Sequence, residues 1–322
     1  MKRYYSILSI MITLLLVAPV AAEDTLTFSS GAGAMSGAVD IAINKGFIQG
    51  ETTRMHYFKN GNQSLKAFLD GKVDVGTTAP NNIITAKGFD PRKHVIIGTI
   101  SYSDSQHRLL VRKDAHIKHL SDLKGKTIAT GGTYAYYHLY KYLLHNGIEC
   151  ADVNINQMKK NKAPGAIASG KVQAVFFHGK PIEQSKKALG ENNWDIYKPQ
   201  NLARKMNLLI VNREMVKKEP QRVENMLLGI MQAEDFIKTN RADSIAILAK
   251  AKKYKPSKMK EAMSDITYEL RLDQSLLLGM ETLETWAIDN KIVSRTKPID
   301  YFDYIDPAPL KKVAPTIVTL VH

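Results

Sequence analysis

The segment Leu69-Asp70-Gly71-Lys72-Val73-Asp74-Val75 ends an amphipathic stretch and begins an apolar one, and a similar segment, Ala168-Ser169-Gly170-Lys171-Val172-Gln173-Ala174, follows later in the chain. A glycine that ends a helix before a strand is common, because glycine adopts the left-handed backbone conformation without strain. The Gly-Lys-Val match is therefore weak by itself. Together with the repeated pattern around it, it indicates a duplicated α/β plan.

Short β-branched or apolar runs alternate with amphipathic stretches around both segments, which is typical of an α/β sheet with crossover helices. Strands of a first lobe are predicted at 25–28, 55–58, 73–77 and 95–100, and strands of a second lobe at 127–130, 153–158, 172–177 and 194–197. Helices are expected after Met35, Gly61 and Pro80 in the first lobe and after Tyr134, Pro164 and Pro181 in the second. The fold class is therefore α/β with two lobes of similar plan.

Two extended stretches, 108–112 and 208–212, lie at the ends of the second lobe and could cross between the lobes as a two-stranded hinge. We therefore expect residues 23–107 and 213–322 to form the first lobe and residues 108–212 the second. Apolar residues recur with helical spacing over 223–237, and another helix is expected over 273–288. These C-terminal helices should pack on the first lobe. A tail with Pro298, Pro307, Pro309 and Pro315 is expected to lack regular structure.

The first 22 residues read as a secretory signal peptide. Lys2 and Arg3 precede an apolar stretch over 7–17, and Val20 and Ala22 occupy the small positions before a cleavage site. A membrane anchor is the alternative, but so short a stretch cannot cross about 30 Å of hydrocarbon as a helix. Cleavage before Glu23, which is not a cysteine, predicts an exported, soluble protein without a lipid anchor.

The composition excludes several protein classes. Of the 322 residues, 44% are hydrophobic and 24% are charged, which rules out a disordered, collagenous or coiled-coil chain. Cys150 is the only cysteine, so a disulfide framework and a four-thiolate metal site are excluded. The net charge of +14 makes nucleic-acid binding a candidate function, but the predicted export argues against it. The densest basic run is interpreted as a solvated helix face, with attraction to anionic membranes or ligands as the alternative; it contains Lys250, Lys252, Lys253, Lys255, Lys258 and Lys260.

Polar loops follow four of the predicted strands, where ligands of open α/β sheets bind and helix N-termini present free N–H groups. The loops lie at 29–36 and 77–82 in the first lobe and at 131–134 and 177–181 in the second. Such residues are also ordinary helix caps, so a single loop would mean little. Four together predict a cleft for an oxyanion or small polar ligand. The candidate ligand-binding residues are Ser30, Gly31, Thr77, Thr78, Gly132, Thr133, Tyr134, Phe177 and His178.

For two of these candidates a structural role is as well supported as ligand contact, since Tyr134 could pack against the protein and His178 could cap the next helix. Motifs of hydrolases, zinc proteases, P-loop proteins and dinucleotide-binding proteins are absent from the sequence. His116 and His119 lie three residues apart in a polar stretch and are interpreted as an exposed turn. We therefore expect no catalytic residue, no metal and no cofactor.

Several motifs, in order and spacing, resemble the periplasmic solute-binding proteins of ABC importers for sulfonates, taurine, nitrate and thiamine precursors. The resemblance covers nearly all of the chain after residue 22. It is carried by Ala42-Ile43-Asn44-Lys45-Gly46-Phe47, by 64–76 with its Leu-Asp-Gly-Lys-Val-Asp sequence, and by 122–129, 132–135 and 283–288. It implies a type II periplasmic binding fold with a mixed sheet in each lobe, and delivery of a solute to a membrane permease. It also implies ligand contacts at Ser30 and Gly31, Thr77 and Thr78, and Thr133 and Tyr134.

The departures from the family pattern bear on the ligand. Tyr134 stands where a small residue is usual, and Gln173, His178 and Gly179 stand where the family often has acids or tryptophan. Without those acids, taurine is a doubtful ligand, and a small anionic solute is favoured. A monomeric receptor is expected. The alternatives are a ligand sensor that contacts a signalling partner and an enzyme that makes the thiamine pyrimidine, which would need a cysteine-rich iron-binding motif.

Overall fold

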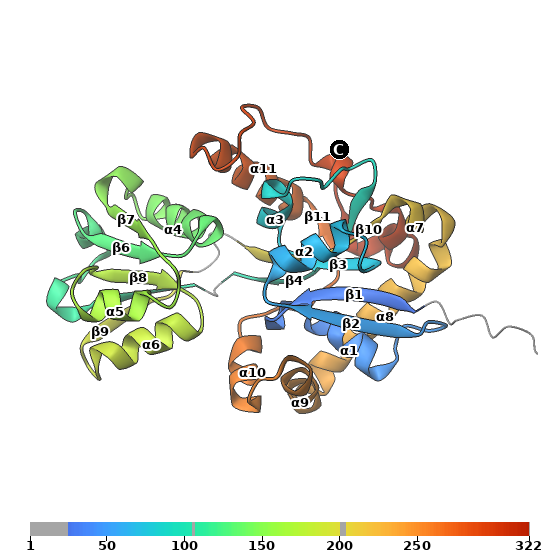
Figure 1. The fold of residues 1–322 in the computed structure, drawn as a ribbon, viewed down its shortest axis with the longest axis horizontal. Coiled ribbons are helices and arrows are strands. Elements are labelled where there is room, and N and C mark those ends of the chain that lie inside the picture. The colour runs from blue at the N-terminus through green and yellow to red at the C-terminus, as the bar shows by residue number, and fades with distance from the viewer. Residues whose placement is uncertain (1–24, 105–106, 200–203, 322) are drawn as a thin grey trace, which may run out of the picture.

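A computed structural model describes residues 25–104, 107–199 and 204–321. Two five-stranded sheets form two separate lobes (Figure 1). The first sheet has the order β2-β1-β3-β10-β4, and the second has the order β7-β6-β8-β5-β9. In each sheet three parallel strands are followed by strands that run antiparallel to them or to each other. The duplicated plan and the mixed sheets are therefore confirmed.

The observed strands match the predicted ones closely. The first sheet contains β1 (Leu26–Gly31), β2 (Thr53–Phe58), β3 (Val75–Thr78), β4 (His94–Ser103) and β10 (Lys205–Asn212). The second contains β5 (Arg108–Arg112), β6 (Thr127–Thr130), β7 (Asn154–Gln157), β8 (Ala174–Phe177) and β9 (Trp194–Tyr197). A small third sheet pairs β11 (Leu272–Asp273) with β12 (Val318–Thr319).

The chain crosses between the two sheets twice, and the strand that follows each crossing lies in the interior of the sheet that the chain enters. The chain passes from β4 in the first sheet to β5, which inserts between β8 and β9. It returns from β9 to β10, which inserts between β3 and β4. The stretches 108–112 and 208–212 are thus strands inside a sheet, and the crossings precede them. Because β10 pairs within the first sheet, residues 205–212 lie with that sheet and not with the second, where we expected them.

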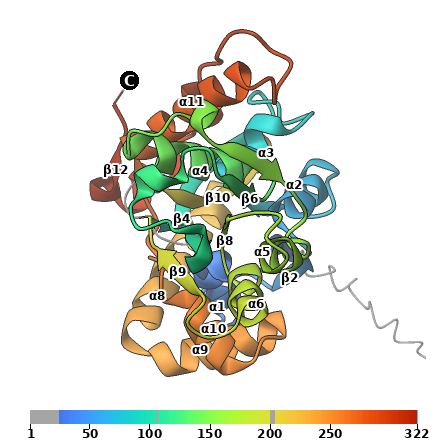
Figure 2. The ribbon, with the colours of Figure 1, turned by 90° about the vertical axis from the view of Figure 1, so that its left-hand side faces the viewer.

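Helices cover both faces of each sheet. In the first lobe α1 and α8 lie on one face and α2 and α3 on the other, as Figure 1 shows. Figure 2 looks onto the second lobe, where α4 packs on one face and α5 and α6 pack on the other. The helices are α1 (Gly37–Lys45), α2 (Gly61–Leu69), α3 (Pro80–Thr85), α4 (Thr133–His145), α5 (Ala163–Ala168), α6 (Lys180–Leu189), α7 (Arg213–Lys218), α8 (Pro220–Thr239), α9 (Arg241–Lys252), α10 (Pro256–Met263), α11 (Gln274–Asp289) and α12 (Ala308–Val313).

The two glycines of the repeated segments have the predicted role. Helix α2 ends at Leu69, and Gly71 adopts a φ of +69° before β3 begins. Helix α5 ends at Ala168, and Gly170 adopts a φ of +76° before β8 begins. A side chain at either position would force the strained left-handed conformation on an L-residue. The chain can therefore turn sharply from helix to strand at both places.

The C-terminal helices complete the first lobe. Buried residues of α8 with helix spacing, including Val223, Met226 and Ile230, join the core that covers the first sheet, as predicted. The prediction of an irregular tail is wrong in part, because α12 buries Leu310 in this core and β12 pairs with β11. Pro309 lies in the first turn of α12, where a missing backbone N–H costs no helical hydrogen bond.

Aromatic contacts join the two lobes at one side. Trp286 of α11 packs edge-on against Tyr136 and Tyr137 of α4, with ring centroids 5.2 and 5.3 Å apart, and Tyr140 lies 6.2 Å away. An ion pair of 2.7 Å between Arg108 and Asp265 adds a second contact. The lobes therefore pack directly against each other as well as through the chain crossings. Over the described residues, every helix is too short or too polar to span a bilayer.

Candidate functional site

The hydroxyl groups at the end of β3 hold the first lobe together. Thr77 is buried and donates a hydrogen bond of 3.0 Å to the carbonyl of Ser29 on the neighbouring strand. Ser64 of α2 donates in turn to the carbonyl of Thr77 at 2.7 Å. Thr78 donates to the carbonyl of Gly61 at 3.1 Å and accepts from Asn82 at 3.0 Å. Both threonine hydroxyls thus cross-link β3 to its neighbours.

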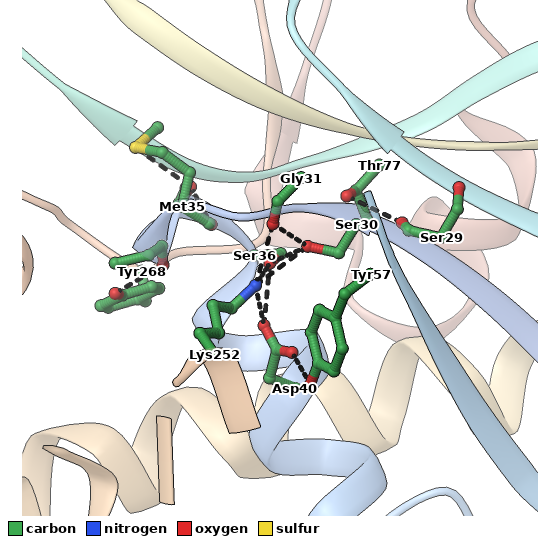
Figure 3. Close-up of polar contacts among 12 residues, drawn as sticks. Ser29, Ser30, Gly31, Met35, Ser36, Asp40, Tyr57, Thr77, Lys252 and Tyr268 are labelled. Atoms are coloured by element: carbon green, nitrogen blue, oxygen red, sulfur yellow. Dashed lines mark hydrogen bonds and ion pairs between the residues drawn. The ribbon is translucent and has the colours of Figure 1, made fainter. Parts of the chain in front are cut away.

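The loop after β1 surrounds a buried lysine (Figure 3). The Nζ of Lys252, the last residue of α9, donates to Ser30 Oγ at 3.0 Å, Ser36 Oγ at 2.9 Å and the carbonyl of Gly31 at 3.2 Å. It also lies 3.0 Å from a carboxylate oxygen of Asp40, and both charged side chains are wholly buried. Lys252 therefore has hydrogen-bond acceptors in several directions and a counter-charge. We call Ser30, Gly31, Ser36, Asp40 and Lys252 the serine–lysine network.

Two further contacts complete this network. Ser36 donates to Asp40 Oδ2 at 2.8 Å, and the hydroxyl of Tyr57 donates to Asp40 Oδ1 at 2.7 Å. Burial, followed by the charge of Asp40, raises the pKa of the Tyr57 hydroxyl, which therefore stays protonated and donates. A buried charge is tolerated when it is paired and hydrogen-bonded in this way. The network fixes the first candidate loop in one conformation.

The interpretation of the basic run as a solvated face is wrong for one residue. Lys252 is buried, whereas Lys250, Lys253, Lys255, Lys258 and Lys260 are exposed. The last turn of α9 points its final lysine toward the β1–α1 loop, where Asp40 supplies the opposite charge. A count of charges along the sequence cannot separate these environments.

In the second lobe, two helices begin at the candidate loops. Helix α4 begins at Thr133 after Gly132, and helix α6 begins at Lys180 after Gly179, whose φ is +65°. Both cap residues are glycines and supply no side-chain cap. The N–H groups of a first turn have no partners within their helix and carry a partial positive charge. The first turn of α4 can therefore receive an anion. The first turn of α6 offers fewer donors, because Pro181 has no N–H and the N–H groups of Ile182 and Glu183 already bond to the carbonyl of Gly179.

Phe177 has a structural role beneath one of these loops. Its side chain is buried in the core on the α5 and α6 face of the second sheet. A Cβ added at Gly131 would lie 3.5 Å from the phenylalanine ring. The ring thus supports the loop from below, which makes Phe177 a packing residue.

Three histidine rings contact one another in the second lobe. The ring centroid of His107 lies 4.6 Å from that of His138 and 5.1 Å from that of His178, and it stacks on Phe176 at 5.1 Å. The ring of Tyr134 meets His138 edge-on at 4.5 Å. We call His107, His138 and His178 the histidine cluster. It brings the two candidates Tyr134 and His178 together through residues that were not predicted.

All three imidazoles are held neutral. Burial is the main cause for His138, whose pKa falls to about 3, and for His107, whose pKa falls well below the usual range. For His178 the positive charge of Lys205 is the main cause, and its pKa falls to about 3. Lys205, at the start of β10, has its own pKa lowered to about 8 by burial. The cluster is therefore uncharged at neutral pH, and a cation from the first sheet lies nearby.

Sequence reasoning missed His107 and His138, although each leaves a signal. His138 follows Tyr134 by four residues in α4, so their side chains share one helix face. His107 precedes Arg108, which pairs with Phe177 in antiparallel register. The same register places residue 107 beside residue 178. An antiparallel pairing of β5 with β8 was needed to see this, and the sequence pattern does not specify pairing.

The other candidate groups show no comparable arrangement. His116 and His119 flank two short 3-10 helices, and their stretch is a set of turns, as expected. Among the described residues, no group of three or more histidine, cysteine, aspartate or glutamate side chains is placed to hold a metal ion. Cys150 is half-buried, and burial raises the pKa of its thiol. A raised pKa makes a thiol a weaker nucleophile at neutral pH.

Comparison with known proteins places this geometry in a family. Residues 37–243 match the model of the family described as NMT1/THI5 like. A Brucella abortus protein named as a candidate binding protein is 26% identical over 281 residues, which cover 81% of this chain and 84% of that protein.

Two solved structures share the fold. The periplasmic aliphatic sulphonate binding protein SsuA from Escherichia coli superposes with a TM-score of 0.71 at 18% identity, covering 87% of this chain and 97% of that one. The desulfurization enzyme DszB superposes with a TM-score of 0.61 at 14% identity, covering 91% and 99%. The fold thus serves both binding proteins and an enzyme, and function must be argued from the site. The match over residues 37–243 shows that this chain belongs to the NMT1/THI5-like family.

Proposed function

We propose that this protein is a periplasmic receptor that captures a small anionic organic solute between its lobes and delivers it to an ABC permease. The observation that carries the proposal is the N-terminus of α4, whose cap residue Gly132 has no side chain, together with the Nε2 of His138 on the same helix, which has no partner among the described residues. Helix N-termini attract anions through free N–H groups and the helix dipole. The family and the fold shared with a sulphonate-binding protein support this proposal.

The two lobes have different parts in the proposed receptor. Ser30, Thr77 and Thr78 have their hydroxyl groups bonded within the first lobe, so this lobe offers a rigid wall. Thr133 starts α4, and its hydroxyl and N–H are offered to the solute beside Tyr134 and His178. The proposal includes no covalent step. Export through residues 1–22, whose structure lies outside the described residues, would bring the receptor to the periplasm.

The direct test is thermal unfolding of the purified protein with alkanesulfonates, nitrate, bicarbonate, aromatic carboxylates, thiamine pyrimidines and flavins. A ligand at 100 times its dissociation constant adds about 2.7 kcal/mol to the free energy of unfolding, which raises the midpoint visibly. A selective rise with one class of anion is expected. A folded protein that no anion of the panel stabilises, before or after ligand is stripped by unfolding and refolding, would contradict the proposal.

Substitutions locate the site once a stabilising anion is found. Thr133→Ala should weaken binding about tenfold without changing the midpoint of the free protein, since one hydrogen bond to a charged group contributes on the order of 1.5 kcal/mol or more. Thr78→Ala should weaken binding less, because its hydroxyl is bonded to Gly61 and Asn82. Thr282→Ala, on the exposed face of α11, is the matched control. Unchanged affinity in both of the first two variants would refute the proposed site.

Delivery to a permease is tested in cells. Deletion of the gene should abolish uptake of the stabilising anion when that anion is scarce in the medium. Uptake that persists, together with loss of a transcriptional response to the anion, would assign the protein to sensing.

A further inference from the structure

We propose that His138 and His178, together with Lys205, form the subsite for the anionic group of the solute, and that the anion binds there together with one proton. The proposal rests on the proposed receptor function and deepens it, because it states the charge that the ligand must carry and how pH controls its capture. It concerns residues on three elements: α4, the loop after β8, and the first residue of β10.

The first argument is the unsatisfied nitrogen of His138. Its side chain is 93% buried, because only 7% of the residue is exposed, and its Nε2 has no hydrogen-bond partner among the described residues. A neutral imidazole has one donor and one acceptor nitrogen, and a buried polar atom without a partner costs free energy. Buried polar groups in native proteins are nearly always bonded. A ligand oxygen that reaches this nitrogen would satisfy it.

The second argument is the sign of the surrounding charge. His107, from the segment before β5, stacks on His138 and meets His178 edge-on. Tyr134 and Tyr137 face His138 from its own helix. The charges that act on the cluster come from Lys205 of β10, Arg108 of β5 and Lys160, and all of them are positive. Arg108 is paired with Asp265. The cluster thus lies in a positive field, and its complement is an anion.

The third argument is the response of an imidazole to a bound anion. An opposite charge within a few ångströms favours the protonated form and raises the pKa. In the free protein the pKa of the buried His138 is about 3, chiefly through burial, and the pKa of His178, which is exposed at the surface, is lowered chiefly by the charge of Lys205. An anion offsets both, because it supplies a counter-charge and a hydrogen-bond acceptor. The neighbouring imidazoles repel each other when charged, so uptake is limited to about one proton.

This linkage fixes the direction of the pH effect. A proton that is bound in the complex but not in the free protein strengthens anion binding as the pH falls. Between the free and the bound pKa, the dissociation constant should fall about tenfold for each unit by which the pH is lowered. The ligand itself must be a strong-acid anion for the effect to come from the protein. Sulfonates and nitrate meet this condition.

The test is a histidine NMR titration of the protein labelled with ¹³C and ¹⁵N in its imidazole rings, with propane-1-sulfonate and with nitrate between pH 5 and 8. Dimethyl sulfone is the neutral control ligand, and His145, exposed at the end of α4, is the reference signal. We expect either anion to shift the His138 and His178 signals and to raise the pKa of one of them from about 3 to about 6, the upper end of the effect of an opposite charge a few ångströms away. Proton uptake of about one per bound anion should appear at pH 5, and should decline above pH 6, in calorimetry in two buffers of different ionisation enthalpy.

Variants identify the source of the effect. Lys205→Met should raise the pKa of His178 in the free protein and weaken binding of both anions, because the charge that lowers this pKa is removed. His138→Phe keeps a ring in the stack but removes the unsatisfied nitrogen, and should reduce the pH dependence of binding. His145→Gln should change neither quantity.

The outcomes separate this proposal from the receptor function. If no histidine of the cluster responds to either anion at about 100 mM, a concentration that would half-saturate a site with a binding free energy of only about −1.4 kcal/mol, the proposal is overturned. If an anion of the panel stabilises the protein without moving the histidine signals, the receptor function stands and the subsite is rejected. If the histidines respond while no panel compound gives selective stabilisation, the subsite stands and the receptor function fails.

Discussion

The serine–lysine network of the first lobe and the histidine cluster of the second lobe both place basic side chains at strand-end loops, yet they differ in how the charge is satisfied. Lys252 has Asp40 at 3.0 Å and three further oxygen acceptors. The histidine cluster has cationic neighbours, and the Nε2 of His138 has no partner among the described residues. The first arrangement is complete within the protein. The second leaves one imidazole nitrogen without a partner in the part of the chain that the structure describes.

This difference separates structural from binding roles within similar sequence patterns. Ser30 and Gly31 were predicted to contact a ligand, but they bind the ammonium group of Lys252. An anion that bound Ser30 from the inter-lobe side would compete with a buried ion pair. The second lobe offers the first-turn N–H groups of α4 and an imidazole nitrogen of His138, neither of which is part of an ion pair. We therefore assign recognition of the anionic group to the second lobe and support of the cleft wall to the first.

The largest effect is expected from breaking the serine–lysine network. Lys252→Met leaves Asp40 charged and buried without its cation, and should lower the free energy of unfolding by about 3 to 5 kcal/mol. Urea unfolding followed by fluorescence measures this change. Lys258→Met is the matched control, because its pair with Glu261 is exposed and should be worth less than about 1 kcal/mol. Equal losses of unfolding free energy in the two variants would show that the buried pair stabilises the protein no more than the exposed pair does.

A double substitution sharpens the same comparison. Lys252→Met combined with Asp40→Asn removes both charges and should recover part of the stability that the single Lys252→Met variant loses. The recovered part measures the cost of the unpaired carboxylate. If the two losses simply add, Asp40 and Lys252 do not act as a pair.

The histidine cluster should make the protein less stable in mild acid. The folded pKa of His138, about 3, lies below the unfolded value of 6.5, so its contribution is present above pH 6.5 and is lost as the pH falls toward 3. Between pH 7 and 5 the loss should be about 2 kcal/mol for this residue. His138→Phe should flatten the pH dependence by about this amount in chemical unfolding at both pH values. A variant whose stability falls as steeply as that of the wild type would show that His138 is not held neutral by folding.

The smallest effect is expected at the edge of the serine–lysine network. Tyr57 is 43% exposed, and only its hydroxyl reaches Asp40, at 2.7 Å. Tyr57→Phe should reduce the free energy of unfolding by about 1 kcal/mol, at the lower end for a hydrogen bond to a charged group because solvent can replace it. Anion affinity should not change. A clear loss of affinity with unchanged stability would move the recognition of the anion into the first lobe.

The sequence predicted the strands and the repeated plan well, because periodicity and turn residues are local signals. Gly71 and Gly170 are examples, since each left-handed glycine marks a helix end that the chain itself specifies. The α12 helix was missed because the closely spaced prolines of the tail were taken as breakers, although Pro309 stands in a first turn that tolerates it.

The candidate site was predicted less well, for a physical reason. Lys252 and Asp40 are far apart in the sequence and meet only through the packing of α9 on the β1–α1 loop. His107 meets His178 only because β5 pairs antiparallel with β8. Local sequence patterns locate the loops. Tertiary contacts decide which polar atoms of those loops have hydrogen-bond partners and which do not.

The assignment of anion recognition to the second lobe is tested most directly by a crystal structure of the protein with the anion that raises its unfolding midpoint most. We predict oxygens of the anion within hydrogen-bond distance of the first-turn N–H groups of α4 and of a nitrogen of His138 or His178, with Lys252 still paired with Asp40. An anion bound to Ser30, with Lys252 turned away from Asp40 toward it, would contradict the account.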